Sequence, residues 1–493
     1  MRVRASFAGA AAALVVSAIA ASGVGAAPYD LDDAVLVSGT SPFLACTAGQ
    51  SEDGVVYDNT EVEPQVAVNP TDQDNVVGNF QQDRWSDGGA RALVAARSFD
   101  GGASWTRNFA AFSECSGNLA YPRTTDPWVS FDAAGKLYQI ALSIDSADLG
   151  LSAVLTSTSD DGGTSWSDPV TVQRDTNPIN FNDKESITAD WTKPDHAYAV
   201  WIRGHLPGEN ISPVGAAHSF AYRGLPMFSK TIDGGETWST PISMARNQNV
   251  YAQGNQIAVL PDGTLVNVFA VLFKGSGIQP GVANQVFMAT TRSTDGGRHW
   301  SAMEKIAPIR TALLTDPDTP NPTSLDQTVR ADDYLPDIAV DKDSGDLYVV
   351  WADGLGTPNN NVVITKSTDG ARSWSTPRAI DQTPGPHAFN QTVTVGSDGT
   401  VAVLYYDFRN NTPDPGLPTD VWLTQSTNRG ETWSEQHVTG PFDMKQAPNA
   451  RGWFLGDYMG LEPISNDGDL TAFFSTTQGD PANVYSVRAN RTP

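Results

Sequence analysis

The chain has 493 residues, of which 56 are acidic and 31 basic, and its formal net charge at pH 7 is −25. Nucleic acid and anionic lipid would repel so acidic a protein, so neither is expected as a partner. The sequence has no C-x-x-C, H-E-x-x-H, G-x-S-x-G or phosphate-binding glycine motif, and its six histidines are scattered. It therefore predicts no metal, no cofactor and no serine-hydrolase site.

The first 27 residues have the pattern of a signal peptide: two arginines, an apolar, alanine-rich run over residues 5–21, and then small residues. The run is too short to span a bilayer, and no later stretch reaches about 18 uninterrupted apolar residues. We therefore expect a secreted, extracellular protein with no membrane span. A membrane anchor is the alternative interpretation of the same run.

Residues 28–60 form an N-terminal segment before the first repeat, and this segment contains Cys46. Cys115 is the other cysteine of the chain. In an oxidising compartment an even pair is more often bridged than free, so we expect a disulfide that ties the segment to the body of the protein. Two free thiols are the alternative.

Six copies of one short motif, S/T-x-D-x-G-x-x-W, recur along the chain at intervals of about 60 to 75 residues. Their third positions are Asp100, Asp161, Asp233, Asp295, Asp369 and Asn428. The motif suits a hairpin turn, because Asp accepts hydrogen bonds from turn amides, Gly permits positive φ, and Trp wedges between sheets. We interpret these aspartates as structural and not catalytic, which the departures Ala371 and Asn428 fit.

Between the motifs the chain shows short apolar runs rich in β-branched residues, for example residues 336–341, 346–351 and 362–367. No segment has sustained helical periodicity. Each interval therefore holds one four-stranded sheet, and such repeats are typical of β-propeller blades. The sequence predicts an all-β propeller over residues 61–493.

After the sixth motif the chain has three more predicted strands, near residues 456–461, 470–474 and 484–487. The fourth strand of that sheet is expected from residues 34–37, which would close the ring and cover a sheet edge. This arrangement favours seven blades over six, and six remains the alternative.

In a propeller the six repeated turns lie on one rim, so the opposite rim is expected to carry the site. The candidates there follow second strands or precede innermost strands: Asp83, Arg84, Trp85, Asp87, Arg203, His205, Asp353, Asp407, Arg409, Arg123, Asp126, Asp183, Glu185, Asn255, Asp332, Asp333, Tyr334, Arg451, Asp457 and Tyr458. Arginine forks bind carboxylates, and tryptophans bind sugar faces. The alternative is that these residues cap strands and bridge neighbouring blades.

With these motifs the mature chain resembles the bacterial sialidase (neuraminidase) superfamily, the BNR or Asp-box propellers. The resemblance implies that Arg84 and Asp87, in Asp83-Arg84-Trp85-Ser86-Asp87, correspond to the family's second-strand arginine and acid/base aspartate. It also implies that Tyr458 corresponds to the tyrosine nucleophile. Two departures stand against it.

The first departure is Glu63-Pro64-Gln65, which stands where the family has an arginine that grips the sialic acid carboxylate. The second is Gly254-Asn255-Gln256, which lacks the glutamate that activates the tyrosine. Glu185 and Asp457 are the candidates to replace that glutamate.

The leading hypothesis is a secreted, sialidase-like glycoside hydrolase that acts on polar or acidic terminal sugars of glycans. Asp87 would be the acid/base, Tyr458 the nucleophile assisted by Asp457 or Glu185, and Arg84 and Arg409 the clamps for an anionic group. The predicted site residues are Asp87, Tyr458, Asp457 and Glu185 for catalysis, and Arg84, Arg409, Asp407, Asn255 and Trp85 for substrate binding. The partner is a glycan or glycoconjugate, and we expect a monomer. The alternative is a non-catalytic glycan- or protein-binding propeller.

Overall fold

The computed structural model describes residues 29–145, 150–206, 223–246, 250–273, 286–331, 334–465 and 467–492. The predicted signal peptide and the candidates Asp332 and Asp333 lie outside these ranges. Within them the chain forms β-strands and three short 3₁₀ helices, η1 (Glu114–Ser116), η2 (Leu325–Gln327) and η3 (Met444–Gln446). No helix among the described residues is long and apolar enough to cross a membrane.

The first half of the chain forms four groups of strands that are consecutive in sequence and antiparallel. They are β3 (Glu61–Val68), β4 (Val76–Arg84), β5 (Ala90–Ser98) and β6 (Thr106–Asn108); β7 (Arg123–Phe131), β8 (Leu137–Ile144), β9 (Ser152–Ser159) and β10 (Val170–Asp175); β11 (Asn180–Ala189), β12 (Ala197–His205), β13 (Arg223–Thr231) and β14 (Ile242–Ser243); and β15 (Val250–Val259), β16 (Leu265–Phe273), β17 (Val286–Ser293) and β18 (Glu304–Pro308).

The second half continues the pattern, with one short parallel pair inserted. The groups are β20 (Asp337–Val340), β21 (Leu347–Asp353), β22 (Asn361–Ser367) and β23 (Arg378–Ala379); β24 (Ala388–Val395), β25 (Val401–Asp407), β26 (Pro418–Ser426) and β27 (Ser434–Asp443); and β29 (Gly460–Pro463), β30 (Leu470–Thr476) and β31 (Asn483–Arg491). The parallel pair is β19 (Val329–Arg330) and β28 (Trp453–Phe454).

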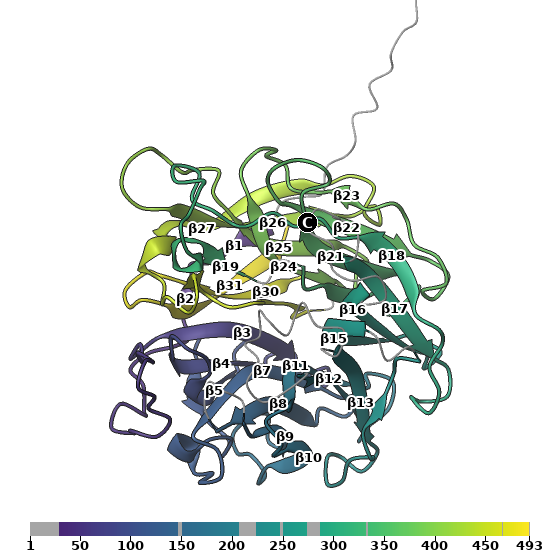
Figure 1. Cartoon of the computed structure of the whole chain (residues 1–493). Coiled ribbons are helices and arrows are strands. Elements are labelled where there is room, and N and C mark those ends of the chain that lie inside the picture. The colour runs from purple at the N-terminus through teal and green to yellow at the C-terminus, as the bar shows by residue number, and fades with distance from the viewer. Residues whose placement is uncertain are drawn as a thin grey trace, which may run out of the picture.

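The N-terminal segment joins the last group. Its strands β1 (Tyr29–Leu31) and β2 (Val35–Leu36) both pair antiparallel with β31. The first group then contacts this sheet, because the Glu61 amide donates to the Ala482 carbonyl at 2.9 Å. Figure 1 shows the groups following one another around the molecule, from purple β3 to the yellow C-terminal strands beside it. The predicted all-β propeller is confirmed.

The repeated turns are held by their own side chains. In the first turn the Asp100 carboxylate accepts hydrogen bonds from the Ser104 amide at 2.8 Å and the Ser104 hydroxyl at 2.6 Å. The Trp105 ring lies 5.5 Å from that of Phe473, so the first turn packs against the last group. The residues that follow the same pattern are Asp161, Asp233, Asp295, Asp369 and Asn428.

Cys46 and Cys115 form the expected disulfide, with their Cα atoms 5.7 Å apart. Since Cys46 precedes β3 and Cys115 lies in η1, the bond ties the N-terminal segment to the connection between the first two groups. The apolar core is divided among clusters between neighbouring groups, for example Tyr138 of β8 with Ile187 of β11 and Trp201 of β12.

Candidate functional site

The innermost strands share an irregularity that shapes the centre of the molecule. In β3, β7, β11, β15 and β24 the register shifts, as a β-bulge does. Each bulge holds one residue at positive φ: Glu63 (55°), Asp126 (53°), Lys184 (52°), Gly254 (67°) and Asn390 (51°). Four of the five are not glycine, so each costs strain of about 1 kcal/mol or more. Backbone strain that recurs at the bulges of several innermost strands indicates a functional region.

Beside these bulges lies a central cavity of about 180 Å³. It is lined by residues of β3, β7, β11, β15, β20, β24 and β29, with Asp457 and Tyr458 entering from the segment before β29. Four of the predicted site residues meet here: Glu185, Asn255, Asp457 and Tyr458. The cavity is therefore the candidate functional site.

Several buried polar atoms of the cavity-lining residues have no hydrogen-bond partner among the described residues. They are Gln65 Oε1, both carboxyl oxygens of Glu185, Asn255 Nδ2, Gln391 Oε1 and Asp457 Oδ1. A buried polar group without a partner costs about 1 to 3 kcal/mol. Because most of these atoms are acceptors, the site is suited to a ligand that is rich in hydroxyl donors, such as a sugar.

Glu185 lies in β11 and is only 2% exposed. Burial, followed by the nearby carboxylate of Asp126, raises its pKa well above the usual value for glutamate. Its carboxyl group therefore holds its proton more firmly than an ordinary glutamate does. A protonated carboxyl in a cavity is equipped to donate a proton to a ligand.

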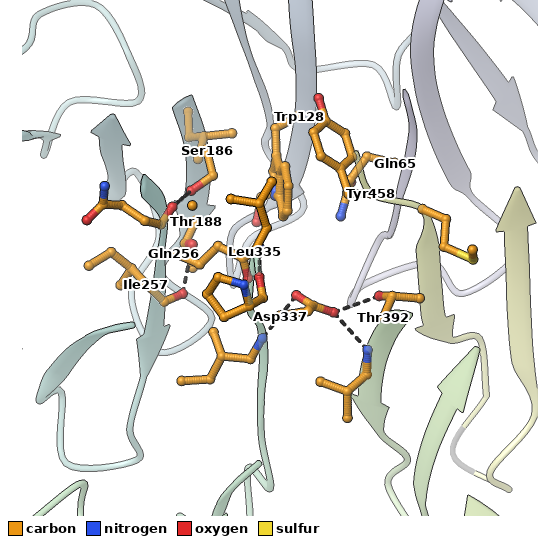
Figure 2. A pocket seen from close by; sticks show the side chains of 18 of the residues that line it. Gln65, Trp128, Ser186, Thr188, Gln256, Ile257, Leu335, Asp337, Thr392 and Tyr458 are labelled. Atoms are coloured by element: carbon orange, nitrogen blue, oxygen red, sulfur yellow. Dashed lines mark hydrogen bonds between the residues drawn. The ribbon is translucent and has the colours of Figure 1, made fainter. Parts of the chain in front are cut away.

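Asp337 is the first residue of β20, and its carboxylate points toward Thr392 (Figure 2). It accepts hydrogen bonds from the Thr392 hydroxyl at 2.7 Å and from the backbone amides of Val393 at 2.7 Å and Ile338 at 3.0 Å. Burial raises the pKa of Asp337 to about 6, although these hydrogen bonds oppose the rise. Asp337 is therefore mostly ionised at pH 7.

Asp457 lies under the cavity with its side chain fully buried, and Lys184 and Arg330 bind it. Arg330 Nη2 lies 3.3 Å from its Oδ2 atom, and Lys184 Nζ forms a closer ion pair with the same oxygen. Burial alone would raise the pKa of Asp457, but the two cations outweigh it and hold that pKa well below the usual range. The Oδ2 atom of this ionised carboxylate thus has its partners within the protein, whereas Oδ1 has none among the described residues.

Tyr458 and Trp128 form the aromatic wall of the cavity, with ring centroids 5.1 Å apart, and Figure 2 shows them side by side. The Tyr458 hydroxyl donates to the Pro127 carbonyl oxygen at 3.2 Å. Burial, reinforced by the charges of Glu63 and Asp126, raises the pKa of Tyr458 well above 10. Tyr458 therefore stays protonated, and its ring presents an apolar face suited to a sugar.

Asp87, the predicted acid/base, lies outside the cavity lining. Its carboxylate pairs with Arg123 at 2.7 Å and accepts a hydrogen bond from the Ser51 hydroxyl at 2.7 Å. Burial would raise the pKa of Asp87, but these hydrogen bonds lower it. An ionised, paired carboxylate is not the form from which a general acid donates, so its catalytic role stays a prediction without support from this geometry.

The predicted clamps also have partners within the protein. Arg84 donates to Gln81 Oε1 at 2.7 Å, and Arg409 pairs with Asp407 and with Glu435, each at 2.5 Å. Arg409 also lies over the Trp422 ring, 3.6 Å from its centroid. Trp85 is 2% exposed and lies under Arg123. Among the described residues, the cavity lining includes none of Arg84, Trp85, Asp407 and Arg409.

The remaining rim candidates have partners within the protein, as the structural alternative predicts. Asp353 accepts hydrogen bonds from the backbone amides of Arg310 and Leu355, and Arg203 pairs with Asp175. Three residues that the sequence did not indicate as site residues take important positions: Lys184, Arg330 and Asp337. Arg330 belongs to the long connection between β18 and β20, where β19 pairs with β28. The length of this connection was the feature of the sequence that could have pointed to Arg330.

No protein-family model matches the chain, and no curated protein matches it. Among solved structures, a Hadza microbial sialidase is 14% identical, with 84% of this chain and 73% of that chain covered and a TM-score of 0.48. The GH93 α-L-arabinofuranosidase of Fusarium graminearum is 11% identical, with 93% and 98% covered and a TM-score of 0.46. The Trypanosoma rangeli sialidase is 11% identical, with 78% and 56% covered and a TM-score of 0.42. Likeness at this level says nothing about substrate, which must be argued from the cavity.

Proposed function

We propose that the chain is a secreted glycoside hydrolase whose active site is the central cavity. The observation that carries this proposal is that two cavity carboxyls lie in different environments: Glu185 has no hydrogen-bond partner among the described residues, whereas Asp337 accepts three hydrogen bonds. Glycosidases commonly use such a pair, one group as the acid and the other as base, nucleophile or charge stabiliser. The different environments of the two carboxyls give them different pKa values, which suits them to different roles in the reaction.

In this proposal Glu185 donates its proton to the glycosidic oxygen as the leaving group departs. The Asp337 carboxylate, held by Thr392, Val393 and Ile338, stabilises the positive charge that develops at the anomeric carbon. The rings of Trp128 and Tyr458 support one face of the sugar. The unpaired oxygens of Gln65 and Gln391 accept hydrogen bonds from its hydroxyl groups.

The test is hydrolysis of a panel of 4-methylumbelliferyl glycosides by the purified protein and by its Glu185→Gln variant. The substitution keeps the shape of the side chain and removes the proton, so we expect kcat to fall by about 10² to 10⁴. Glu236→Gln, at an exposed position in the third repeated turn, is the control and should keep full rate. An inert wild-type protein, or an active Glu185→Gln variant, would overturn the proposal.

A non-catalytic glycan-binding propeller is the second candidate. The two groups that the family resemblance would make catalytic already have partners within the protein, which favours this candidate. Asp87 pairs with Arg123, and the Tyr458 hydroxyl donates to a carbonyl oxygen. Glycan binding in the cavity without turnover of any substrate would decide for this candidate.

A further inference from the structure

Three cationic side chains lie at or beside the cavity, and they come from separate parts of the chain. Lys184 stands at the bulge of β11, Arg84 ends β4, and Arg330 arrives on the inserted strand β19. The guanidinium groups of Arg84 and Arg330 both lie over the Phe454 ring, at 4.9 and 4.3 Å from its centroid. Burial, followed by repulsion from Arg330, lowers the pKa of Arg84 to about 10. Such a cluster of cations is a site for an anion.

The anion is already supplied by the protein. Asp457 binds Lys184 and Arg330 through one oxygen, and its side chain is completely shielded from solvent. Glu63 lies 3.8 Å from Lys184 and completes the group. A ligand carboxylate that bound Lys184 would compete with this buried, ion-paired aspartate, and displacing the aspartate would leave its charge without compensation.

The cavity adds a second obstacle to anions. Its lining holds one cation, Lys184, and two ionised carboxylates, Asp337 and Asp457, while burial raises the pKa values of the lining residues Glu185 and Glu462. Lys184 is committed to Asp457. The field inside the cavity is therefore unfavourable for a negatively charged ligand and tolerant of a neutral or positively charged one.

We propose that Asp457 is a specificity-determining residue, a built-in carboxylate that fills the cationic cluster so that the cavity accepts uncharged sugars and rejects acidic ones. The inference rests on the proposed function, because it takes the central cavity as the sugar-binding site. It names uncharged sugars as the ligands in place of the acidic sugars expected from the sequence. It concerns binding and not the chemical step. Its test therefore does not depend on turnover.

The experiment measures binding to the full-length secreted protein by ligand-detected NMR and by thermal shift. The probes are methyl glucoside, methyl galactoside, their uronic acid counterparts and N-acetylneuraminic acid. For the wild-type protein we expect each neutral sugar to bind at least tenfold more tightly than its acidic counterpart. An acidic sugar that binds as well as its neutral counterpart, or no binding of any neutral sugar, would overturn the inference.

The Asp457→Asn variant keeps the volume of the side chain and frees the cationic cluster. We expect it to bind N-acetylneuraminic acid at least tenfold more tightly than the wild-type protein does. Asp407→Asn is the matched control, because Asp407 also pairs with an arginine, Arg409, but does not line the cavity. It should gain no affinity for the acid, and an equal gain there would contradict the role of Asp457.

If Asp457→Asn does not fold, the ranking of neutral over acidic sugars in the wild-type protein decides the question alone. If it folds and gains nothing, the inference is wrong. Failure of the proposed function has a different signature: neutral sugars would bind in preference to acidic ones, yet no glycoside would be hydrolysed.

Discussion

The two levels of the propeller differ in how their polar groups are satisfied. At the repeated turns each carboxylate finds its partners within four residues, as Asp100 does with Ser104. At the central cavity, buried groups such as Glu185 and Asn255 Nδ2 have no partner among the described residues. Non-glycine residues at positive φ occur at both levels, in the bulges and, as Ala371 and Arg429, in the turns. The turns therefore satisfy their polar groups internally, whereas the cavity leaves buried polar groups available to a ligand.

The same contrast appears in the range of the interactions. A repeated turn is local, whereas Lys184 and Asp457 are 273 residues apart in sequence and meet across the ring. Mutations at the turns should consequently change the free energy of unfolding and spare activity. Mutations of cavity groups without a partner, such as Glu185, should change activity or binding and spare stability, whereas loss of the buried Asp457 ion pairs should also lower stability.

The largest expected effect on stability comes from the disulfide. It closes a loop with a sequence separation of 69 residues, so replacing both cysteines with serine should lower the free energy of unfolding by about 4 kcal/mol. Denaturant titration of Cys46→Ser/Cys115→Ser measures the loss. Because neither cysteine lines the cavity, any turnover at a permissive temperature should be unchanged. A large fall in kcat with intact folding would show that the N-terminal segment also shapes the site.

The sequence predicted the fold well because its signals are local. Each repeated turn carries its own Asp, Gly and Trp, so the period and the strand pattern could be identified without knowledge of distant contacts. The disulfide was equally accessible, since the chain has two cysteines and therefore one possible intramolecular pairing.

The site could be predicted only in part, because its chemistry depends on residues that are distant in sequence. Asp87 resembles a catalytic acid in its local context, but Arg123 and Ser51 hold it as a paired anion. Arg330 reaches the site only through the parallel pairing of β19 with β28. Asp337 was noted only as part of a predicted strand, because its cavity position follows from the ring and not from its neighbours.

The pH dependence of activity provides the next largest effect, and it belongs to the cavity. Asp337 must be ionised to act, and its pKa is about 6, so kcat/KM should fall about tenfold for each pH unit below 6. On the alkaline side, activity should fall when Glu185 loses its proton. The pH–rate profile measures both limbs.

Glu462 lines the same cavity, and burial raises its pKa to about 7, so Glu462→Gln is the necessary control. The acid limb should remain at about pH 6 in this variant if Asp337 is responsible. An acid limb that disappears with Glu462→Gln would transfer the role of the ionised carboxyl to Glu462.

A smaller effect is expected at the first repeated turn. Asp100→Ala removes the hydrogen bonds to Ser104, but the aspartate is exposed to solvent, so the loss should be only about 1 kcal/mol. Thermal melting measures it, and the rate of glycoside hydrolysis at a permissive temperature should be unchanged. A lost rate without lost stability would mean that the turns belong to the active site after all.

The smallest expected effect is at Ala371, which stands in the fifth turn where the other five turns have glycine. Its φ is +61°, so Ala371→Gly should relieve strain of about 1 to 2 kcal/mol. Ala371 is also fully buried against Leu260 and Leu347, and loss of its methyl group should cost about 0.8 kcal/mol. The greater freedom of glycine in the unfolded chain should cost about 0.4 to 1 kcal/mol more. These contributions nearly cancel, so the free energy of unfolding should change by less than about 1 kcal/mol in denaturant titration. A decrease in the free energy of unfolding well beyond about 1 kcal/mol would show that the packing of the Ala371 methyl group contributes more to stability than relief of backbone strain does.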